Sequence, residues 1–230
     1  MAKEVKDKSS DKPIIDVEQA YDKTERYFEE NKKSLFIIIG AVIGLVGLYF
    51  GWKFLYLNPK EEEAQASMYK AEMFFANDSF KLAINGKADT LGFAALVEDY
   101  GITKSGNLAR YYLGVSYLHT GKFQEAIDEL KEFDSDDQFL GAVATGCIGD
   151  AYMELNNKEE AVNYYLKAAQ KNSNKLTSPI YLKKAAMAYE DMGKKADARK
   201  LYEQIKTEFS ESQEAQQIDK YIARTTEGTN

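Results

Sequence analysis

Residues 108–133 read LARYYLGVSYLHTGKFQEAIDELKEF, and a similar stretch recurs twice farther along the chain. Residues 143–169 read VATGCIGDAYMELNNKEEAVNYYLKAA, and residues 181–205 read YLKKAAMAYEDMGKKADARKLYEQI. Equivalent positions recur after 35 residues and again after a further 37, as Gly114, Gly149 and Ala186 show. A recurrence at this interval indicates a series of similar structural units stacked along the chain.

Each of the three stretches has the pattern of two helices joined by a tight turn. Small residues recur inside both helices, where they would let the two backbones approach each other. They are Gly114, Gly149 and Ala186 in the first helices, and Ala126, Ala161 and Ala198 in the second helices. Gly121, Asn156 and Gly193 lie between the helices and are residue types that tolerate the left-handed backbone of such a turn.

This pattern resembles the tetratricopeptide repeat, a helix-turn-helix unit of about 34 residues. It departs from the family at the usual tryptophan position, where Arg110, Thr145 and Leu182 stand, and it lacks the terminal proline of each repeat. The resemblance implies an all-α fold: a tetratricopeptide-repeat α-solenoid with three repeats over residues 107–209.

Weaker helical patterns flank the three repeats. Residues 58–106 are interpreted as a degenerate first repeat, whose insertion over 77–92 has room for a short helix. Asn58 followed by Pro59 is typical of a helix start, with Asn58 as its N-cap. Residues 210–224 have one apolar face and suit a capping helix. Residues 225–230 are expected to fray.

One apolar segment decides the topology of the remainder. Residues 35–57 read LFIIIGAVIGLVGLYFGWKFLYL, and the 18 residues from Leu35 to Trp52 carry no charge. A helix of 23 residues is about 34 Å long, which is enough to cross the hydrocarbon core of a membrane. Aromatic rings gather at one end, at Tyr49, Trp52 and Tyr56, as is typical of a membrane interface. We interpret this segment as a single transmembrane helix, an uncleaved signal anchor.

The polar N-terminal part divides into two segments. Residues 1–15 have almost nothing to bury and are predicted to be a disordered cytoplasmic tail. Residues 16–34 have helical apolar spacing and predict an amphipathic juxtamembrane helix, which either contacts a membrane surface or partner or has no binding role. Positive charges are more frequent before the apolar segment than after it. This bias predicts a cytoplasmic N-terminus and an extracytoplasmic repeat domain.

Four glycines fall on one narrow strip of the apolar helix, a spacing that permits close approach of a second membrane helix. They are Gly40, Gly44, Gly47 and Gly51. We interpret the strip as a membrane-helix packing face, for either a second copy or a different protein. The alternative is that glycine is simply frequent in membrane helices.

Composition excludes several classes of function. The 37 acidic and 30 basic residues give a net charge of -7, which argues against a nucleic-acid-binding protein. One cysteine and one histidine exclude multi-cysteine and multi-histidine metal sites. No phosphate-binding loop or dinucleotide motif is found. His119 and Cys147 are interpreted as structural residues, and we expect no catalytic site, metal or cofactor.

A tetratricopeptide array usually holds its ligand on the concave face made by its first helices. By analogy, the resemblance implies a protein-binding groove that leans apolar and suits an amphipathic helix or an unfolded segment. Its predicted residues are Leu108, Tyr111, Val115, Leu118, Asp150, Met153, Lys183, Met187 and Glu190. The alternative is that these side chains only contact neighbouring repeats.

The layout as a whole is similar to the YfgM-like family. The shared features are a charged stub, TERYFEENKKSL at 24–35, a Gly-rich anchor ending in GWKF at 51–54, and a tetratricopeptide domain beyond it. Members are ancillary subunits of the bacterial Sec translocon that associate with a membrane-anchored prolyl isomerase chaperone. The resemblance implies an inner-membrane protein with a periplasmic repeat domain, which binds these proteins or unfolded secreted clients. The alternative is a scaffold for another cell-envelope complex.

Overall fold

The computed structural model describes residues 17–171 and 173–226, with side chains from residue 25 onward. It divides into two compact units, the first ending at Tyr56 and the second beginning at Leu57. The segment predicted to be disordered, residues 1–15, lies outside the described residues.

The first unit is helical throughout its described part. Helix α1 (Val17–Trp52) contains both the predicted juxtamembrane helix and most of the apolar segment, and it ends at the chain's one tryptophan. A π-helix, η1 (Lys53–Leu57), follows it. The apolar side chains of α1 are exposed within this unit, Leu45 by 68% and Leu48 by 73%. Within the described part of this unit no other element covers these apolar side chains, a surface that fits a membrane-facing helix.

The start of helix α2 (Asn58–Ala76) differs from the sequence interpretation. Pro59 lies in the first turn as predicted, but Asn58 does not cap the helix. The cap position is Leu57, which has right-handed helical dihedral angles and makes no side-chain capping bond. The wider π-helical turn lets the backbone stay helical up to the proline, which has no N–H to donate and would disturb a regular α-helix.

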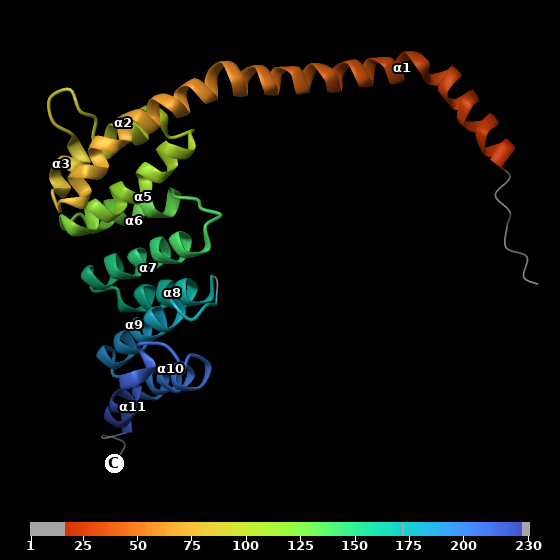
Figure 1. The fold of residues 1–230 in the computed structure, drawn as a ribbon. Helices are drawn as coiled ribbons and strands as arrows, with labels where there is room; N and C mark the ends of the chain where they lie inside the picture. Colours follow the sequence, from red (N-terminus) through yellow and green to blue (C-terminus); the bar gives the residue numbers. More distant parts are fainter. Residues whose placement is uncertain (1–16, 172, 227–230) are drawn as a thin grey trace, which may run out of the picture. The chain divides into compact units, whose positions relative to one another are not determined.

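The second unit consists of helix pairs stacked in chain order (Figure 1). Helix α2 packs with α3 (Phe80–Asn85) and α4 (Phe93–Tyr100), and α3 confirms the short helix expected within 77–92. Three pairs follow, each with two helices joined by a short turn. They are α5 (Lys104–His119) with α6 (Phe123–Glu132), α7 (Gln138–Glu154) with α8 (Lys158–Gln170), and α9 (Ser178–Asp191) with α10 (Lys195–Glu208).

These pairs confirm the tetratricopeptide-like fold and its turn chemistry. Gly121, Asn156 and Gly193 have positive φ angles of 78°, 57° and 73°. The predicted small positions also lie where helices meet. A Cβ atom added to Gly149 would stand 2.6 Å from Cδ1 of Tyr165, so only glycine leaves room for that ring. The first pair begins at Lys104, three residues before the predicted boundary at 107, because Thr103 caps α5 by accepting a hydrogen bond from the Gly106 amide at 2.9 Å.

The C-terminal capping helix begins later than the sequence predicts. A turn and a 3₁₀-helix, η2 (Ala215–Gln217), precede helix α11 (Ile218–Thr226). Ser212 is buried, and its hydroxyl accepts a hydrogen bond from the Ala215 amide at 3.2 Å, which holds the turn. Helix α11 includes Thr225 and Thr226, so these two residues of the predicted frayed tail are ordered, and residues 227–230 lie outside the described residues.

Candidate functional site

An open cavity of about 880 Å³ is formed mainly by the first helices of the three repeats. Helices α5, α7 and α9 supply most of the lining, and α6 and α8 add one aromatic side chain each. The lining residues are Leu118, His119, Gly121, Phe123, Asp150, Met153, Glu154, Tyr165, Lys184, Met187, Ala188 and Asp191. Because three consecutive repeats contribute, the cavity exists only in the assembled array.

Four of the nine predicted groove residues meet at this cavity: Leu118, Asp150, Met153 and Met187. The most exposed of the apolar residues among them is Met187, whose side chain is 47% exposed. Methionine is flexible and polarizable, so a floor that contains two of them can adapt to apolar side chains of different shape.

Three other predicted residues pack between repeats rather than in the cavity. Val115 is buried in the core formed by the first and second repeats, and Tyr111 packs against the same core. Burial raises the pKa of Tyr111 to about 12. Leu108 packs against the core that α2, α3, α4 and α5 share. These side chains stabilise the array, which is the alternative that the sequence left open for them.

The last two predicted residues, Lys183 and Glu190, contact helix α11. Glu190 accepts hydrogen bonds from the Tyr202 hydroxyl at 2.7 Å and from Nε of Arg224 at 2.9 Å. Burial alone would raise the pKa of Glu190, but the bonds from Arg224 and Tyr202 outweigh it and lower the pKa. Lys183 lies 4.9 Å from the centroid of the Tyr221 ring. The capping helix therefore covers the C-terminal end of the predicted groove.

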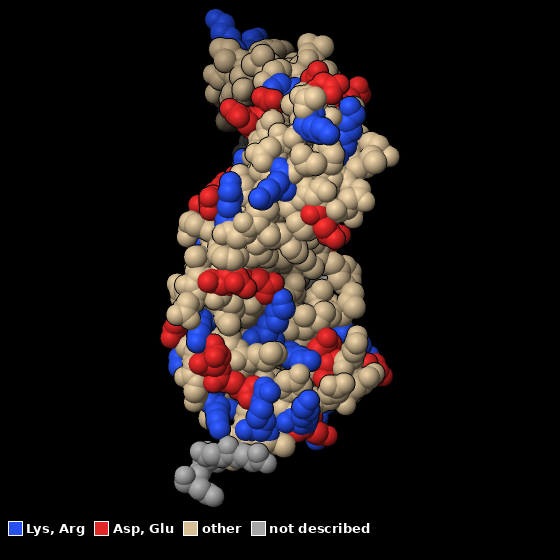
Figure 2. All heavy atoms as spheres, turned by 90° about the vertical axis from the view of Figure 1, so that its left-hand side faces the viewer, with Lys and Arg blue, Asp and Glu red and all other residues tan. Residues whose placement is uncertain are grey.

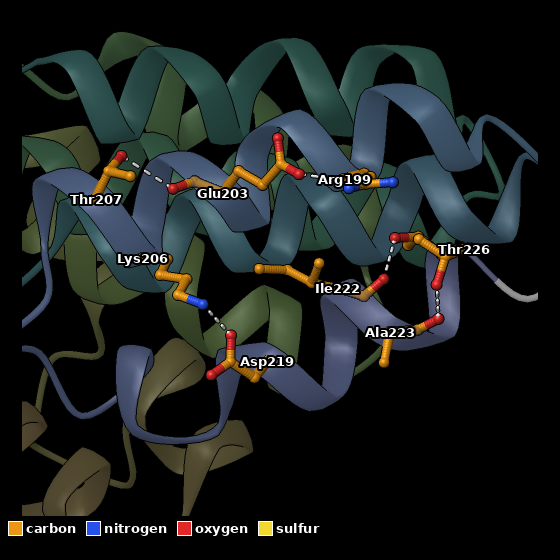
Figure 3. Close-up of polar contacts among 9 residues, drawn as sticks. Arg199, Glu203, Lys206, Thr207, Asp219, Ile222, Ala223 and Thr226 are labelled. Carbon is orange, nitrogen blue, oxygen red and sulfur yellow. Dashed lines mark hydrogen bonds and ion pairs between the residues drawn. The ribbon is translucent and has the colours of Figure 1, made fainter.

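One further contact joins helix α11 to helix α10, and another holds the last turn of α11 itself. Lys206 of α10 reaches Asp219 of α11 at 2.6 Å, as Figure 3 shows. In the last turn of α11 the Thr226 hydroxyl donates to the Ala223 carbonyl at 2.6 Å. An exposed ion pair contributes little by itself, so the burial of Ile218 and the packing of Tyr221 and Ile222 against the same core carry most of this attachment.

A polar network lies in the middle of the cavity. Lys184 contacts both oxygens of Asp150, at 2.7 and 2.8 Å, and the Tyr165 hydroxyl donates to Oδ1 of the same carboxylate at 2.7 Å. Burial and the neighbouring Asp150 raise the pKa of Tyr165. The charge of the Asp150 carboxylate is thus compensated by the Lys184 ammonium, and a ligand in the cavity meets an ion pair that already has its hydrogen-bond partners.

Tyr181 packs beside this network, with the Lys184 ammonium 5.8 Å from the centroid of its ring. Its ring lies against Gly146, where an added Cβ atom would stand 2.0 Å from Cε1 of the ring. Sequence reasoning missed Lys184, Tyr165 and Phe123 as cavity residues. A signal was present for Lys184, which follows the predicted Lys183, but helical periodicity alone did not distinguish which of the two lysines faces the cavity.

The rim of the cavity is polar. The His119 ring stacks on Phe80 with centroids 4.2 Å apart and planes 2° from parallel. Asp191 pairs with Lys158 at 2.6 Å, and Glu154 is exposed. Over the face of the molecule drawn in Figure 2, acidic and basic side chains are intermingled and separated by uncharged surface. That face has no single-sign field of the kind that nucleic acid requires.

Cys147 lies beside the network and is half-buried. Burial and the negative charge of Asp150 raise the pKa of Cys147 to about 11, so the thiol stays protonated at neutral pH. A protonated thiol is a poor nucleophile and a poor metal ligand. Among the described residues, no cluster of three His, Cys, Asp or Glu side chains is placed to hold a metal ion.

The glycine strip on α1 is open within its own unit. A Cβ atom added at Gly40, Gly44, Gly47 or Gly51 would meet no atom within 4 Å. The described residues contain one helical stretch that is long and apolar enough to cross a membrane, judged by length and composition.

Comparison with solved structures supports the fold of the second unit. The repeats of a Podospora anserina protein described as a kinesin light chain, with nearly identical TPR-like repeats, superpose with a TM-score of 0.55 at 18% sequence identity. The match covers 72% of this chain and 86% of that one. A single-residue variant of the same protein gives the same score and identity, with 85% of its chain covered. At this identity the likeness shows the fold alone.

Comparison with curated proteins finds no match. Comparison with protein families gives a match to the family described as "T7SS, ESX-1 secretion system protein EccA1, N-terminal domain". The match extends over residues 76–221, from the end of α2 into α11, which is well over half of the chain. The chain belongs to this family of EccA1 N-terminal, TPR-like domains.

Proposed function

We propose that this protein is a membrane-anchored protein-interaction scaffold that binds an extended or helical segment of a partner in the cavity on its first helices. The observation that carries the proposal is the cavity itself, about 880 Å³ with an apolar floor of Leu118, Phe123, Met153 and Met187. A cavity of this size, with an apolar floor and polar groups in its middle and at its rim, suits a peptide segment that presents both apolar and polar side chains.

We propose that α1 anchors the repeat domain at the outer surface of a bacterial inner membrane. The length and apolar character of residues 35–57 support an anchor, and the positive charges at Lys32 and Lys33 support a cytoplasmic N-terminus. In this topology the repeats are periplasmic. The strip from Gly40 to Gly51 is then available for a second membrane helix.

The partners we propose are Sec translocon subunits, a membrane-anchored prolyl isomerase chaperone and unfolded secreted clients. Support comes from the resemblance of residues 24–54 and of the repeats to the YfgM-like family. A second candidate is a scaffold for the assembly of another cell-envelope complex. The family match favours it, because that family is named for a protein of the ESX-1 secretion system.

Affinity purification of the full-length protein from detergent extracts, with mass spectrometry of what co-purifies, tests the proposal. Met187→Glu places a charge on the cavity floor, and Leu176→Glu makes the same change at a residue that is 63% exposed outside the cavity. We expect the partner to be lost with Met187→Glu and kept with Leu176→Glu. Equal retention with both variants would contradict a role for the cavity.

The double variant Gly44→Leu, Gly47→Leu separates the membrane contact from the cavity contact. Translocon subunits or a prolyl isomerase that fade with this variant support the translocon role. Subunits of a different envelope complex support the second candidate. Co-purification of neither with the parent protein would contradict both.

A further inference from the structure

A second cavity, of about 500 Å³, lies between α6, α7 and α8 and shares no residue with the first. It is formed by the second helices of the first two repeats and the helix between them. Its lining residues are Leu130, Lys131, Phe133, Gly141, Ala144, Thr145, Ile148, Tyr164, Lys167, Gln170 and Lys171. We call this cavity the lysine cleft.

The charge of the lysine cleft is of one sign. It contains Lys131, Lys167 and Lys171 but no Asp or Glu, although acidic residues outnumber basic ones in the chain. None of the three lysines forms an ion pair with another described residue. Three like charges around one cavity repel one another, and an anionic ligand would relieve that repulsion.

Two of the lysines are positioned by a pair of aromatic rings. Tyr152 and Tyr164 stack with centroids 5.3 Å apart. The Lys131 ammonium donates to the Tyr152 hydroxyl at 3.1 Å and lies 5.7 Å from the Tyr164 centroid, while Lys167 lies 4.7 Å from that centroid. The hydrogen bond with Tyr152 raises the pKa of Lys131, so this side chain is charged throughout the neutral range. The rings restrict two side chains that otherwise lose much entropy on binding.

The third lysine, Lys171, packs against helix α7 at a position where Gly141 has no side chain. A Cβ atom added to Gly141 of α7 would stand 3.0 Å from Cε and 3.2 Å from Nζ of Lys171. The Lys171 ammonium therefore lies directly against the backbone of α7. A larger residue at position 141 would displace it.

Apolar side chains form one wall of the cleft, and Thr145 and Gln170 are its uncharged polar residues. Leu130, Ala144 and Ile148 are buried, and Phe133 is half-buried beside them. A free inorganic anion would gain nothing from such a wall. A protein segment that carries carboxylates next to an apolar side chain would use both the wall and the charges.

We infer that the lysine cleft is a second docking site of the scaffold and binds an acidic segment of a partner protein, with carboxylates on the three ammonium groups and an apolar side chain against Leu130 and Ile148. This site uses the outer helices of the array rather than the first helices. It therefore does not depend on the cavity of the proposed function.

The probe is a fluorescent peptide of alternating Glu, Leu and Phe, titrated against full-length protein in neutral detergent and read by anisotropy, with a Lys-for-Glu peptide as control. We expect binding of the acidic peptide only. The triple variant Lys131→Gln, Lys167→Gln, Lys171→Gln should weaken it by about tenfold or more. A triple variant of equal net charge, Lys87→Gln, Lys194→Gln, Lys220→Gln, should bind like the parent.

A variant that keeps all charges tests the lysine cleft without the risk that the triple variant fails to fold. Gly141→Ala favours the helix and only displaces the end of Lys171, so it should stay folded and still weaken the acidic peptide by a fewfold. Equal weakening by both lysine triples would overturn the inference, since general electrostatics would then explain binding. The inference would also be overturned if the acidic peptide did not bind the parent protein. The same holds if inorganic phosphate displaced the peptide when both supply the same concentration of negative charge.

Met187→Glu distinguishes failure of this inference from failure of the proposed function. That residue lines the first cavity only. We expect the variant to bind the acidic peptide as the parent does. If Met187→Glu abolished peptide binding, the peptide would occupy the first cavity and the lysine cleft would not be its site.

Discussion

Single residues fix the turns on which the stacked pairs depend. Asn156 has a φ of 57°, in the left-handed region. Gly121 and Gly193, at the equivalent turns of the other two repeats, have the same backbone conformation. Asparagine tolerates this region better than other L-residues, but glycine adopts it without steric cost. Replacing Asn156 by glycine should therefore change stability little or raise it by up to about 1 kcal/mol.

Asn156→Val should behave in the opposite way, because a β-branched residue is strained in the left-handed region. We expect a loss of about 1–2 kcal/mol. Urea unfolding of the full-length protein in detergent, followed by circular dichroism, measures both variants. An unchanged midpoint for Asn156→Val would show that the turn can relax into another conformation.

Gly149 tests the close approach of two helices at the residue scale. An added methyl group would meet the Tyr165 ring at 2.6 Å, and that ring is held by its hydrogen bond to Asp150. We predict that Gly149→Ala lowers stability by about 1–3 kcal/mol, despite the better helix propensity of alanine. Asn163→Ala, an exposed change in the facing helix α8, is the control and should have almost no effect. Stability equal to the parent's in Gly149→Ala would mean that α7 and α8 can separate at low cost.

At the scale of elements, the capping helix should respond to pH through Glu190. Its pKa is lowered in the folded protein, so its contribution is complete above its ordinary pKa of about 4.5 and disappears as the pH falls through the lowered value. We expect the protection of α11 against hydrogen exchange, taken relative to the intrinsic rate at each pH, to fall as the pH drops below about 4.5. Glu190→Gln should exchange faster at neutral pH and lose the additional pH dependence. A pH dependence that survives this substitution would assign it to another carboxylate.

The elements also show what the sequence could predict and what it could not. The helices of the repeats and their turns followed from small residues at fixed spacing, because only small side chains fit where two helices touch. Asn58 looked like a cap, yet the π-helical turn before it keeps the backbone helical. The capping segment looked like one helix over 210–224, but the buried Ser212 bonds its own turn and delays α11 to Ile218. Both exceptions depend on local backbone geometry that side-chain periodicity does not encode.

The candidate site was only partly predictable for a related reason. The position of a residue in the repeat places it on the first helix, but it does not say how large the neighbouring side chains are. Val115 is buried by the adjacent repeat, and the Glu190 carboxylate already accepts hydrogen bonds from Tyr202 and Arg224. The lysine cleft was not anticipated, because its residues come from three helices and no repeat position unites them.

At the scale of the whole molecule, the proposed topology makes a direct prediction. In a Cys147→Ser background, Lys194→Cys places one thiol at an exposed position between α9 and α10. A membrane-impermeant maleimide should label it in intact spheroplasts, and detergent should not increase the labelling. Labelling that appears only after lysis would place the repeats in the cytoplasm and contradict the periplasmic proposal.

The position of Trp52 makes tryptophan fluorescence a probe of the first unit only. It is the one tryptophan of the chain, it closes α1, and it is 47% exposed, while the second unit has tyrosines but no tryptophan. Tryptophan emission from the unlabelled protein thus reports on the end of the apolar helix alone. Quenching by lipids brominated at known depths would locate that end in a bilayer, with no tryptophan signal from the repeats.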